Sequence, residues 1–345
     1  MIVTPSNSFG LDKVKLYIED FSIKDYSKCG FTVQPAPIDL STGVNADALL
    51  FKDRCGVEVQ GSHAYQNTDI YNLTIKPQGL WVTFNPSKPY HPFNLVDDNR
   101  VFNDRVQTVL NDLMSKGINA DWMGAKLSRL DIAQNTLLDG SVQSYGQVWP
   151  WIKQKRSKHT RKYPDGFGTG NDSWGTIFYN KGKESGHDDI KNFLRAEIQI
   201  KQVRSVKSMV GCNKLGQLFD FGLGGVREVY KTTMKEKVLR ITDGANQHTI
   251  KYDDEIQILQ MLKKDFKKSA ISKHLQLMGM PYFLETYGDP DVYADVLLQA
   301  GYSRMAVNRN MKQIRKQIIL YGMVYEDKHN TVGKMLRELT YKLVA

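Results

Sequence analysis

Residues 193–200 read FLRAEIQI, and this stretch decides what kind of fold the chain adopts. Its small and apolar residues alternate with polar ones: Leu194, Ala196, Ile198 and Ile200 against Arg195, Glu197 and Gln199. Successive side chains of a β-strand point to opposite faces of a sheet. The stretch therefore predicts a strand with one face on a core and one polar face.

Two further stretches have the same character: LSRLDIA at 127–133 and TIFYNK at 176–181. Alternation predicts that Leu127, Arg129, Asp131 and Ala133 share one face, opposite Leu130 and Ile132. It also predicts that Tyr179 and Lys181 share a face, where the ammonium would favour the phenolate. Because a buried acid is costly, such faces are either open to water with Arg–acid pairs, or form a site. In the second interpretation, Asp131 and Glu197 hold Mg²⁺ or Mn²⁺ beside Tyr179.

The composition of the 345 residues is that of a soluble protein, with 41% hydrophobic and 24% charged residues. A net charge of +10 favours an anionic partner, of which nucleic acid is the commonest. We expect no membrane span, because no apolar run approaches the ~20 residues that a bilayer requires. No signal-peptide pattern opens the sequence, and its three cysteines are far apart, so we expect a cytoplasmic protein.

The order of patterns along the chain predicts an α+β fold. Strands are expected at 56–61 and within 69–86, a helix at 97–117, and more strands at 126–134, 174–181 and 192–201. Helices are also expected at 141–154 and 202–219, and the basic stretch between 153 and 172 is expected to be a loop. We predict an antiparallel sheet domain with flanking helices over residues 1–245, then a mostly helical region over 246–345.

LSRLDIAQN, IFYNKGKE and FLRAEIQIK, in this order, resemble the replication initiators of rolling-circle plasmids of the trans-acting Rep type. They resemble the gene II/X replication proteins of filamentous phages more distantly. WVTFNPSK, and the stretch FGTGNDSWG before IFYNK, are also similar to segments of the plasmid group. The resemblance covers about residues 80–210 and implies a DNA-nicking domain.

The resemblance also implies roles for single residues. Tyr179 would be the nucleophile that forms a covalent 5′-phosphotyrosine, followed by Asn180 and Lys181, and Asp131 and Glu197 would bind the metal. The sequence departs from the plasmid group where that group has arginines or acids: Gly170, Ile177, Asn135 and Gln199. With fewer acids, metal ligands from elsewhere, such as Asp172 or Glu184, are a further alternative. The seven histidines form no His-x-His pair, so the histidine-based class of nicking enzymes is not indicated.

Basic residues gather in two places and predict contacts with DNA. Before Tyr179 lie Lys155, Arg156, Lys158, Arg161 and Lys162, with Trp149, Trp151 and Tyr163 as candidates for base stacking or, for the tryptophans, core packing. Near the C-terminus, two helices joined at Gly301 carry Arg309, Lys312, Arg315 and Lys316. This pair is compatible with a helix-turn-helix reader of duplex DNA and equally with a solvated basic face. Arg129 and Arg195 are further candidates for phosphate contact.

The sequence therefore predicts an initiator of rolling-circle replication in a bacterial cytoplasm, encoded by a phage or a plasmid. It would nick a single-stranded or cruciform origin and work with a host helicase and polymerase, as a monomer or a homodimer. The alternative is a non-catalytic DNA-binding protein, either a repressor or a single-strand binder, and a third interpretation is an RNA-directed nuclease. The carboxylate pair beside the tyrosine separates the first two, because a pure binder gains nothing from acids near phosphate.

Overall fold

The fold is that of a computed structural model of the 345-residue chain. The structure describes residues 7–25, 29–34, 63–76, 78–87, 95–152, 157–163, 165–239, 264–265, 276, 290–299, 302–324 and 331–344. The strand expected at 56–61 and the expected domain boundary near 245 lie outside these residues.

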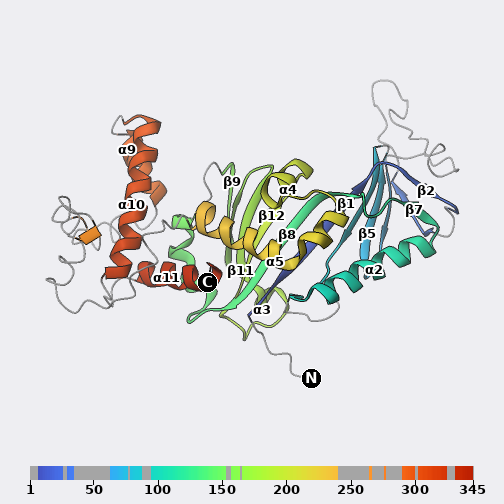
Figure 1. The fold of residues 1–345 in the computed structure, drawn as a ribbon. Coiled ribbons are helices and arrows are strands. Elements are labelled where there is room, and N and C mark those ends of the chain that lie inside the picture. Colours follow the sequence, from blue (N-terminus) through green and yellow to red (C-terminus); the bar gives the residue numbers. More distant parts are fainter. Residues whose placement is uncertain are drawn as a thin grey trace.

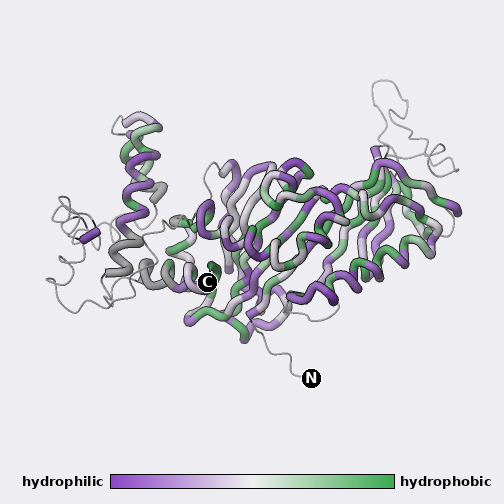
Figure 2. The backbone as a smooth tube through the Cα atoms, in the orientation of Figure 1, coloured by the Kyte–Doolittle hydropathy of each residue, from purple (hydrophilic) through white to green (hydrophobic). Residues whose placement is uncertain are grey.

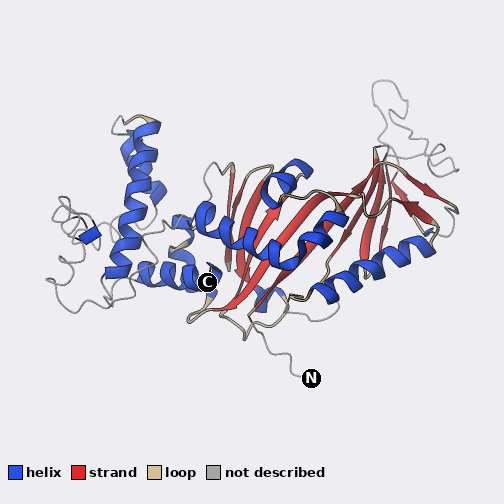
Figure 3. Ribbon diagram, in the orientation of Figure 1, coloured by secondary structure: helices blue, strands red, loops and turns tan. Residues whose placement is uncertain are grey.

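A ten-stranded antiparallel sheet forms the body of the molecule (Figures 1 and 3). Its order is β3-β4-β5-β6-β1-β8-β12-β11-β10-β9, and β2 and β7 form a separate two-stranded sheet. The strands are β1 (Ser8–Ile18), β2 (Phe21–Ile23), β3 (Thr32–Gln34), β4 (His63–Asn67), β5 (Tyr71–Lys76), β6 (Gly79–Phe84), β7 (Ile118–Ala120), β8 (Lys126–Leu137), β9 (His159–Tyr163), β10 (Gly166–Gly170), β11 (Trp174–Asn180) and β12 (Phe193–Ile200). The predicted α+β class with an antiparallel sheet is thereby confirmed.

Helices flank this sheet and follow it along the chain. They are α2 (Asn99–Ser115), η2 (Val142–Gln147), η3 (Trp149–Ile152), α3 (Lys181–Glu184), α4 (Val203–Val210), α5 (Leu215–Thr233), η4 (Met234–Val238), α9 (Pro290–Gln299), α10 (Arg304–Val324) and α11 (Thr331–Val344). Helix α2 agrees with the prediction, since Asp98 caps its first turn and Gly117, at φ 77°, follows its end.

Three local predictions were wrong. The helix expected at 202–219 is two helices, because Gly211 at φ 86° ends α4 in a left-handed conformation. The helix expected at 141–154 is two 3₁₀ helices on either side of Val148. The expected basic loop contains β9 and β10, which extend the sheet at one edge beside β11.

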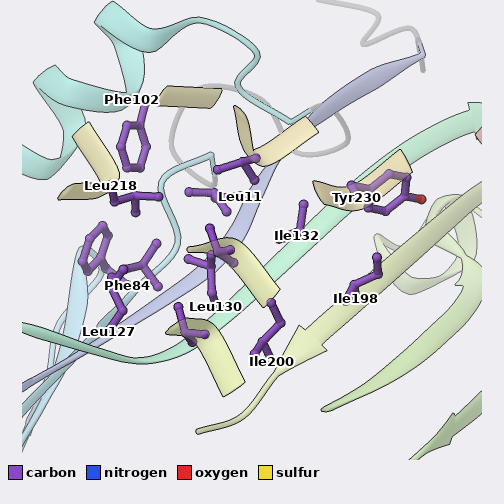
Figure 4. Close-up of a cluster of buried hydrophobic side chains, with 14 of the residues drawn as sticks. Leu11, Phe84, Phe102, Leu127, Leu130, Ile132, Ile198, Ile200, Leu218 and Tyr230 are labelled. Carbon is purple, nitrogen blue, oxygen red and sulfur yellow. The ribbon is translucent and has the colours of Figure 1, made fainter. Parts of the chain in front are cut away.

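One face of the sheet is apolar and carries the core (Figure 4). Ile132 of β8 and Ile198 and Ile200 of β12 pack there beneath Leu218 and Tyr230 of α5. Helices α2, α4 and α5 lie across this side of the sheet (Figure 1), and hydrophilic and hydrophobic residues alternate along the strands (Figure 2). The polar residues of the same strands are thereby turned to the opposite face.

Two irregularities in strand pairing change which side chains reach that polar face. The register of β1 against β8 shifts between the pairs Lys15–Arg129 and Leu16–Leu127. Leu127 therefore lies in the core, and the prediction that it shares the face of Arg129 was wrong. A second shift lies between Leu11–Ile132 and Lys13–Asp131. Asp12 is the extra residue there, and this bulge places it beside the polar face.

The C-terminal helices make two kinds of contact. Leu336, Leu339 and Leu343 of α11 join the main core, and the Gln134 side chain of β8 donates a hydrogen bond of 2.6 Å to the Lys342 carbonyl. Helices α9 and α10 pack on each other through a separate small cluster built on Leu297. The last helix therefore belongs structurally to the sheet domain, although it falls within the predicted C-terminal region.

Candidate active site

The polar faces of β11, β12 and β8 converge on one group of side chains. In the strand register Tyr179 lies opposite Arg195, Arg195 lies opposite Asn135, and Gln199 lies opposite Asp131. Glu197 lies between Arg195 and Gln199 on the same face of β12. The predicted convergence of Tyr179, Asp131 and Glu197 on one sheet face is therefore present in the structure.

Tyr179 and Glu197 form the central contact of this group. The phenol hydroxyl donates a hydrogen bond of 2.6 Å to Glu197 Oε1, and the Gln199 side chain donates one of 3.2 Å to Glu197 Oε2. The first distance is short enough for a carboxylate to take the proton of the phenol directly. Gln199 thus holds the Glu197 carboxylate in place.

Burial sets the protonation of this pair. It raises the pKa of Tyr179 above 10, and the charge of Glu197 raises it further, while Arg195 acts in the opposite direction. The Tyr179 hydroxyl is therefore protonated at neutral pH and needs a base in order to react. The pKa of Glu197 is also raised, first by burial and then by the nearby Asp12 carboxylate, so this carboxylate is a stronger base than an ordinary glutamate.

Asp131 and Asp12 each hold one arginine. Arg129 donates two parallel hydrogen bonds to Asp131, both of 2.8 Å, from Nε to Oδ1 and from Nη2 to Oδ2. Arg195 donates from Nη1 to Asp12 Oδ1 and from Nε to Asn135 Oδ1, each at 2.7 Å. Burial raises the pKa of Asp131 although Arg129 opposes that shift. The two guanidinium groups are thereby fixed on either side of the acids.

Asp12 was not singled out in the sequence, and two signals pointed to it. Leu11 and Val14 are both core residues three positions apart in a strand that otherwise alternates, which indicates a bulge between them. Asp12 is also an acid in mid-strand, as Asp131 and Glu197 are.

The two residues after Tyr179 lie elsewhere. Strand β11 ends at Asn180, so Lys181 belongs to α3 and does not continue the alternation; its ammonium pairs with Glu184. The prediction that Lys181 shares the face of Tyr179 was wrong, and Arg195 is the cation beside the phenol. Asn180 is buried and caps α3, since its Oδ1 accepts a hydrogen bond of 3.1 Å from the Lys183 amide.

The predicted DNA-contacting residues before Tyr179 are spread over β9 and its surroundings. Arg161 and Lys162 are exposed on β9, and Lys158 pairs with Asp172, whereas Lys155 and Arg156 lie outside the described residues. Trp149 is 5% exposed and stacks on Phe178 with ring centroids 5.4 Å apart, so it is a core residue. Tyr163 is 42% exposed; the side chain of Trp151 lies outside the description.

A hollow lies beside this group on the same face of the sheet. Its walls are His159, Arg161 and Tyr163 of β9, and Gln199 and Lys201 at the end of β12. Glycines 168, 170 and 175 form its floor. All three glycines are buried, and they carry no side chain that would fill the hollow.

The acids form no preassembled metal centre in the described part of the chain, since no group of three or more His, Cys, Asp or Glu side chains there is arranged to hold an ion. The two alternative acidic ligands pair with lysines, Asp172 with Lys158 and Glu184 with Lys181. Asp131 and Glu197 do provide the oxygen-only donor set that suits Mg²⁺ or Mn²⁺. Burial raises the pKa of both carboxyl groups, and the charge of Asp131 raises the pKa of Glu197 further. A bound cation would therefore stabilise the two charged carboxylates.

The predicted basic residues lie on α10, the helix that follows α9 along the chain; Gly301, where the two helices were predicted to join, lies outside the described residues. Arg309, Lys312 and Lys316 are exposed, and Arg315 is half-buried. Within the described ranges, no helix is both long and apolar enough to cross a bilayer.

Comparison with known proteins gives little further information. No family model matches the chain, and no curated protein matches it. Among solved structures, the chain is similar to a rolling circle replication initiator protein from Geobacillus stearothermophilus, with 12% sequence identity and a TM-score of 0.33, over 72% of this chain and 90% of that chain. At this level the likeness assigns neither a family nor the role of any residue.

Proposed function

We propose that the protein is a DNA-nicking and strand-transfer enzyme that initiates rolling-circle replication, with Tyr179 as its nucleophile. The observation that carries this proposal is the hydrogen bond of 2.6 Å from the Tyr179 hydroxyl to the buried Glu197 carboxylate. It pairs a candidate nucleophile with a base on the polar face of the sheet, which also carries two arginines. The motif resemblance described above assigns the same tyrosine the same role.

The reaction follows from these positions. Glu197 takes the phenol proton as the Tyr179 oxygen attacks a backbone phosphorus, and the bond from phosphorus to the 3′ oxygen breaks. The 3′ oxygen takes a proton from water and leaves as a hydroxyl, and the 5′ phosphate stays on Tyr179. Arg195 and Arg129 would face the negative charge of the phosphate. Attack of a 3′ hydroxyl on the phosphotyrosine reverses the step and rejoins a strand.

We further propose that Mg²⁺ or Mn²⁺ is held by Asp131 and Glu197 together with oxygens of the bound DNA. Magnesium sites commonly combine one or two carboxylates with substrate phosphates, so a third protein acid is not required. For this, Arg129 would move from Asp131 toward the phosphate. When bound, the ion would supply positive charge next to the phosphate.

The remaining surfaces would place the DNA. The hollow between β9 and β12 offers Arg161 and Lys201 for phosphates and the exposed Tyr163 ring for an unpaired base. Helices α9 and α10, with the basic residues of α10, would read the duplex part of an origin. The free 3′ hydroxyl would then be extended by a host polymerase behind a host helicase in the bacterial cytoplasm.

A denaturing gel tests the proposal. The protein is incubated with labelled single-stranded oligonucleotides from its own replicon and Mn²⁺, and a covalent adduct should survive denaturation. Tyr179→Phe should abolish the adduct and retain DNA binding, whereas Tyr163→Phe is a matched control that should still form it. An adduct that survives Tyr179→Phe would assign the nucleophile to another residue. Binding without an adduct on any origin fragment would favour the non-catalytic DNA-binding protein.

A further inference from the structure

A second polar surface lies on the same sheet face, on the other side of the acids from the hollow. We call it the lysine–aromatic face: Lys13, Lys15, Tyr17, Lys76 and Trp81. Lys13 and Lys15 of β1 lie opposite Asp131 and Arg129 of β8, and Tyr17 lies opposite Trp81 of β6. Their neighbours in the strands, such as Val14, Leu16 and Val82, are all buried in the core, so these five side chains point away from it.

Two aromatic rings form the centre of this face. The rings of Tyr17 and Trp81 lie with centroids 5.0 Å apart, and both residues are half-exposed. The Tyr17 hydroxyl donates a hydrogen bond of 2.7 Å to the Gln78 carbonyl, which restrains the ring. Lys76 Nζ lies 5.9 Å from the Trp81 ring centroid. Rings of this kind beside a cation form a platform on which an unpaired base stacks.

Lys13 of this face lies near the Asp131 carboxylate, whereas Lys15 and Lys76 have no such anion among the described residues. No carboxylate of the described residues forms an ion pair with Lys15 or Lys76, and the groups that act on Lys15 are the cations Lys76, Arg129 and Lys13. Burial first, and then these three cations, lower the pKa of Lys15. Lys126, which lies next to the Tyr17 ring but outside this set of five, does have an anionic partner, because it pairs with Glu19 at 3.2 Å. Like charges held together in a half-buried surface are unfavourable alone and favourable around an anion.

We propose that the lysine–aromatic face binds unpaired nucleotides of the DNA strand that Tyr179 cuts, on the side of the cut phosphate opposite the hollow. This inference rests on the proposed function for the identity of the ligand. Strands β12 and β8 separate β11 from β1, so at about 4.8 Å per strand the lysines lie about 14 Å from Tyr179. A bound strand would thus cross the sheet from the hollow, past Glu197 and Asp131, to Lys15 and Trp81.

Fluorescence anisotropy of full-length protein without metal tests this inference, because binding is then measured apart from cleavage. The variant is Lys15→Gln/Lys76→Gln, and the matched control is Lys207→Gln/Lys214→Gln, whose lysines are exposed on and next to the helices of the opposite face. With a single strand that extends on both sides of the cut site, the first variant should bind about tenfold more weakly. Its slope of log affinity against log salt should fall by about 1.4, the value for two lost phosphate contacts on single strands. The control should bind as wild type does.

Trp81→Leu and shortened oligonucleotides locate the contact. Trp81→Leu should weaken binding of the long strand by about tenfold through lost stacking. When the strand is shortened stepwise from one end, wild type and both lysine–aromatic variants should converge in affinity, and shortening from the other end should leave the difference intact. Equal affinities and salt slopes for wild type and Lys15→Gln/Lys76→Gln at every length would overturn the inference. A loss seen only with duplex DNA would overturn it too.

These results are separable from the fate of the proposed function. If Tyr179→Phe still forms an adduct, or if none forms, while Lys15→Gln/Lys76→Gln weakens strand binding, the lysine–aromatic face stands and the nicking chemistry does not. If the adduct depends on Tyr179 and the double variant binds normally, the nicking chemistry stands and the face does not.

Discussion

Replacing Glu197 with glutamine should remove nicking and at the same time stabilise the fold. Glutamine has the same shape, and its carbonyl oxygen can still accept the Tyr179 hydroxyl that donates at 2.6 Å. The Gln199 amide, now 3.2 Å from Glu197 Oε2, can turn its oxygen toward the new amide group. No buried polar group is left without a partner, so the change removes one charge and one base and little else.

The two effects have opposite signs. Loss of a general base costs about 10²- to 10⁴-fold in rate, and this should be the fall in adduct formation. Burial and the nearby Asp12 carboxylate raise the pKa of Glu197 above 4.5, so its charge opposes folding at neutral pH. Removing that charge should raise the free energy of unfolding by about 1 kcal/mol, the usual gain when a strained functional site is relaxed. For the sheet domain this corresponds to a melting temperature about 2–4 °C higher.

The pH dependence checks the cause of the stabilisation. A carboxyl group whose folded-state pKa is raised gives stability that is present at low pH and lost as pH rises through that pKa. The advantage of Glu197→Gln in melting temperature should therefore be largest near neutral pH and should shrink as acid protonates Glu197. Nicking by wild type should fall in acid, at a pH above the ordinary glutamate value of 4.5.

Thermal melts at several pH values, and a quenched time course of adduct formation at each, measure both quantities. Glu19→Gln is the matched control, because it makes the same substitution at an exposed glutamate that pairs with Lys126 and leaves Glu197 as the base. Wild-type rates in a stabilised Glu197→Gln variant would refute the reasoning that Glu197 is the base. A destabilised variant, with an advantage that does not vary with pH, would refute the reasoning about its buried charge.

Three further predictions follow from other contacts. Trp149→Ala should lower the free energy of unfolding by about 3–5 kcal/mol in denaturant titration, because Trp149 is buried and stacks on Phe178; loss of DNA binding at unchanged stability would contradict this assignment. Millimolar Mn²⁺ with a bound oligonucleotide should raise the melting temperature of wild type but not of Asp131→Asn, and an equal rise in both would place the ion elsewhere. Truncation before residue 331 should destabilise the sheet domain in thermal melts, because α11 buries Leu339 and Leu343 in its core, and an unchanged melt would show that this packing is dispensable.

The polar face could be predicted from the sequence because it rests on alternation alone. FLRAEIQI and IFYN pair with their neighbouring strands without a register shift, so the faces of Glu197 and Tyr179 followed from counting. The strand order was not available from this pattern, since alternation says nothing about which strands are neighbours. The approach of Tyr179 to Glu197 required the pairing of β11 with β12.

Other predictions failed where a strand ends or bulges. Lys181 breaks the alternation because Asn180 caps a new helix that begins at Lys181. The spacing of Tyr179 and Lys181 in the sequence does not indicate this helix start. Leu127 moved to the core because the pairing with β1 shifts by one residue at Ser128. A similar shift brought Asp12 beside Arg195, and that contact joins residues 183 positions apart.

Carboxylates are unexpected on a surface proposed to bind DNA, and the contacts of Asp131, Asp12 and Glu197 give a reason for each. Asp131 holds the guanidinium of Arg129 through two hydrogen bonds, and Asp12 and Asn135 hold that of Arg195 through two more. Both guanidinium groups are thereby held on the sheet face, and under the proposed function Arg195 would lose less side-chain entropy on binding DNA. Glu197 is the exception, because its oxygens accept from the Tyr179 hydroxyl and the Gln199 amide, and no arginine in the described part of the chain donates to it. Charge pairing with arginines accounts for Asp131 and Asp12 but not for Glu197, whose burial raises its pKa and whose partner is a phenol, as the proposed role of Tyr179 requires.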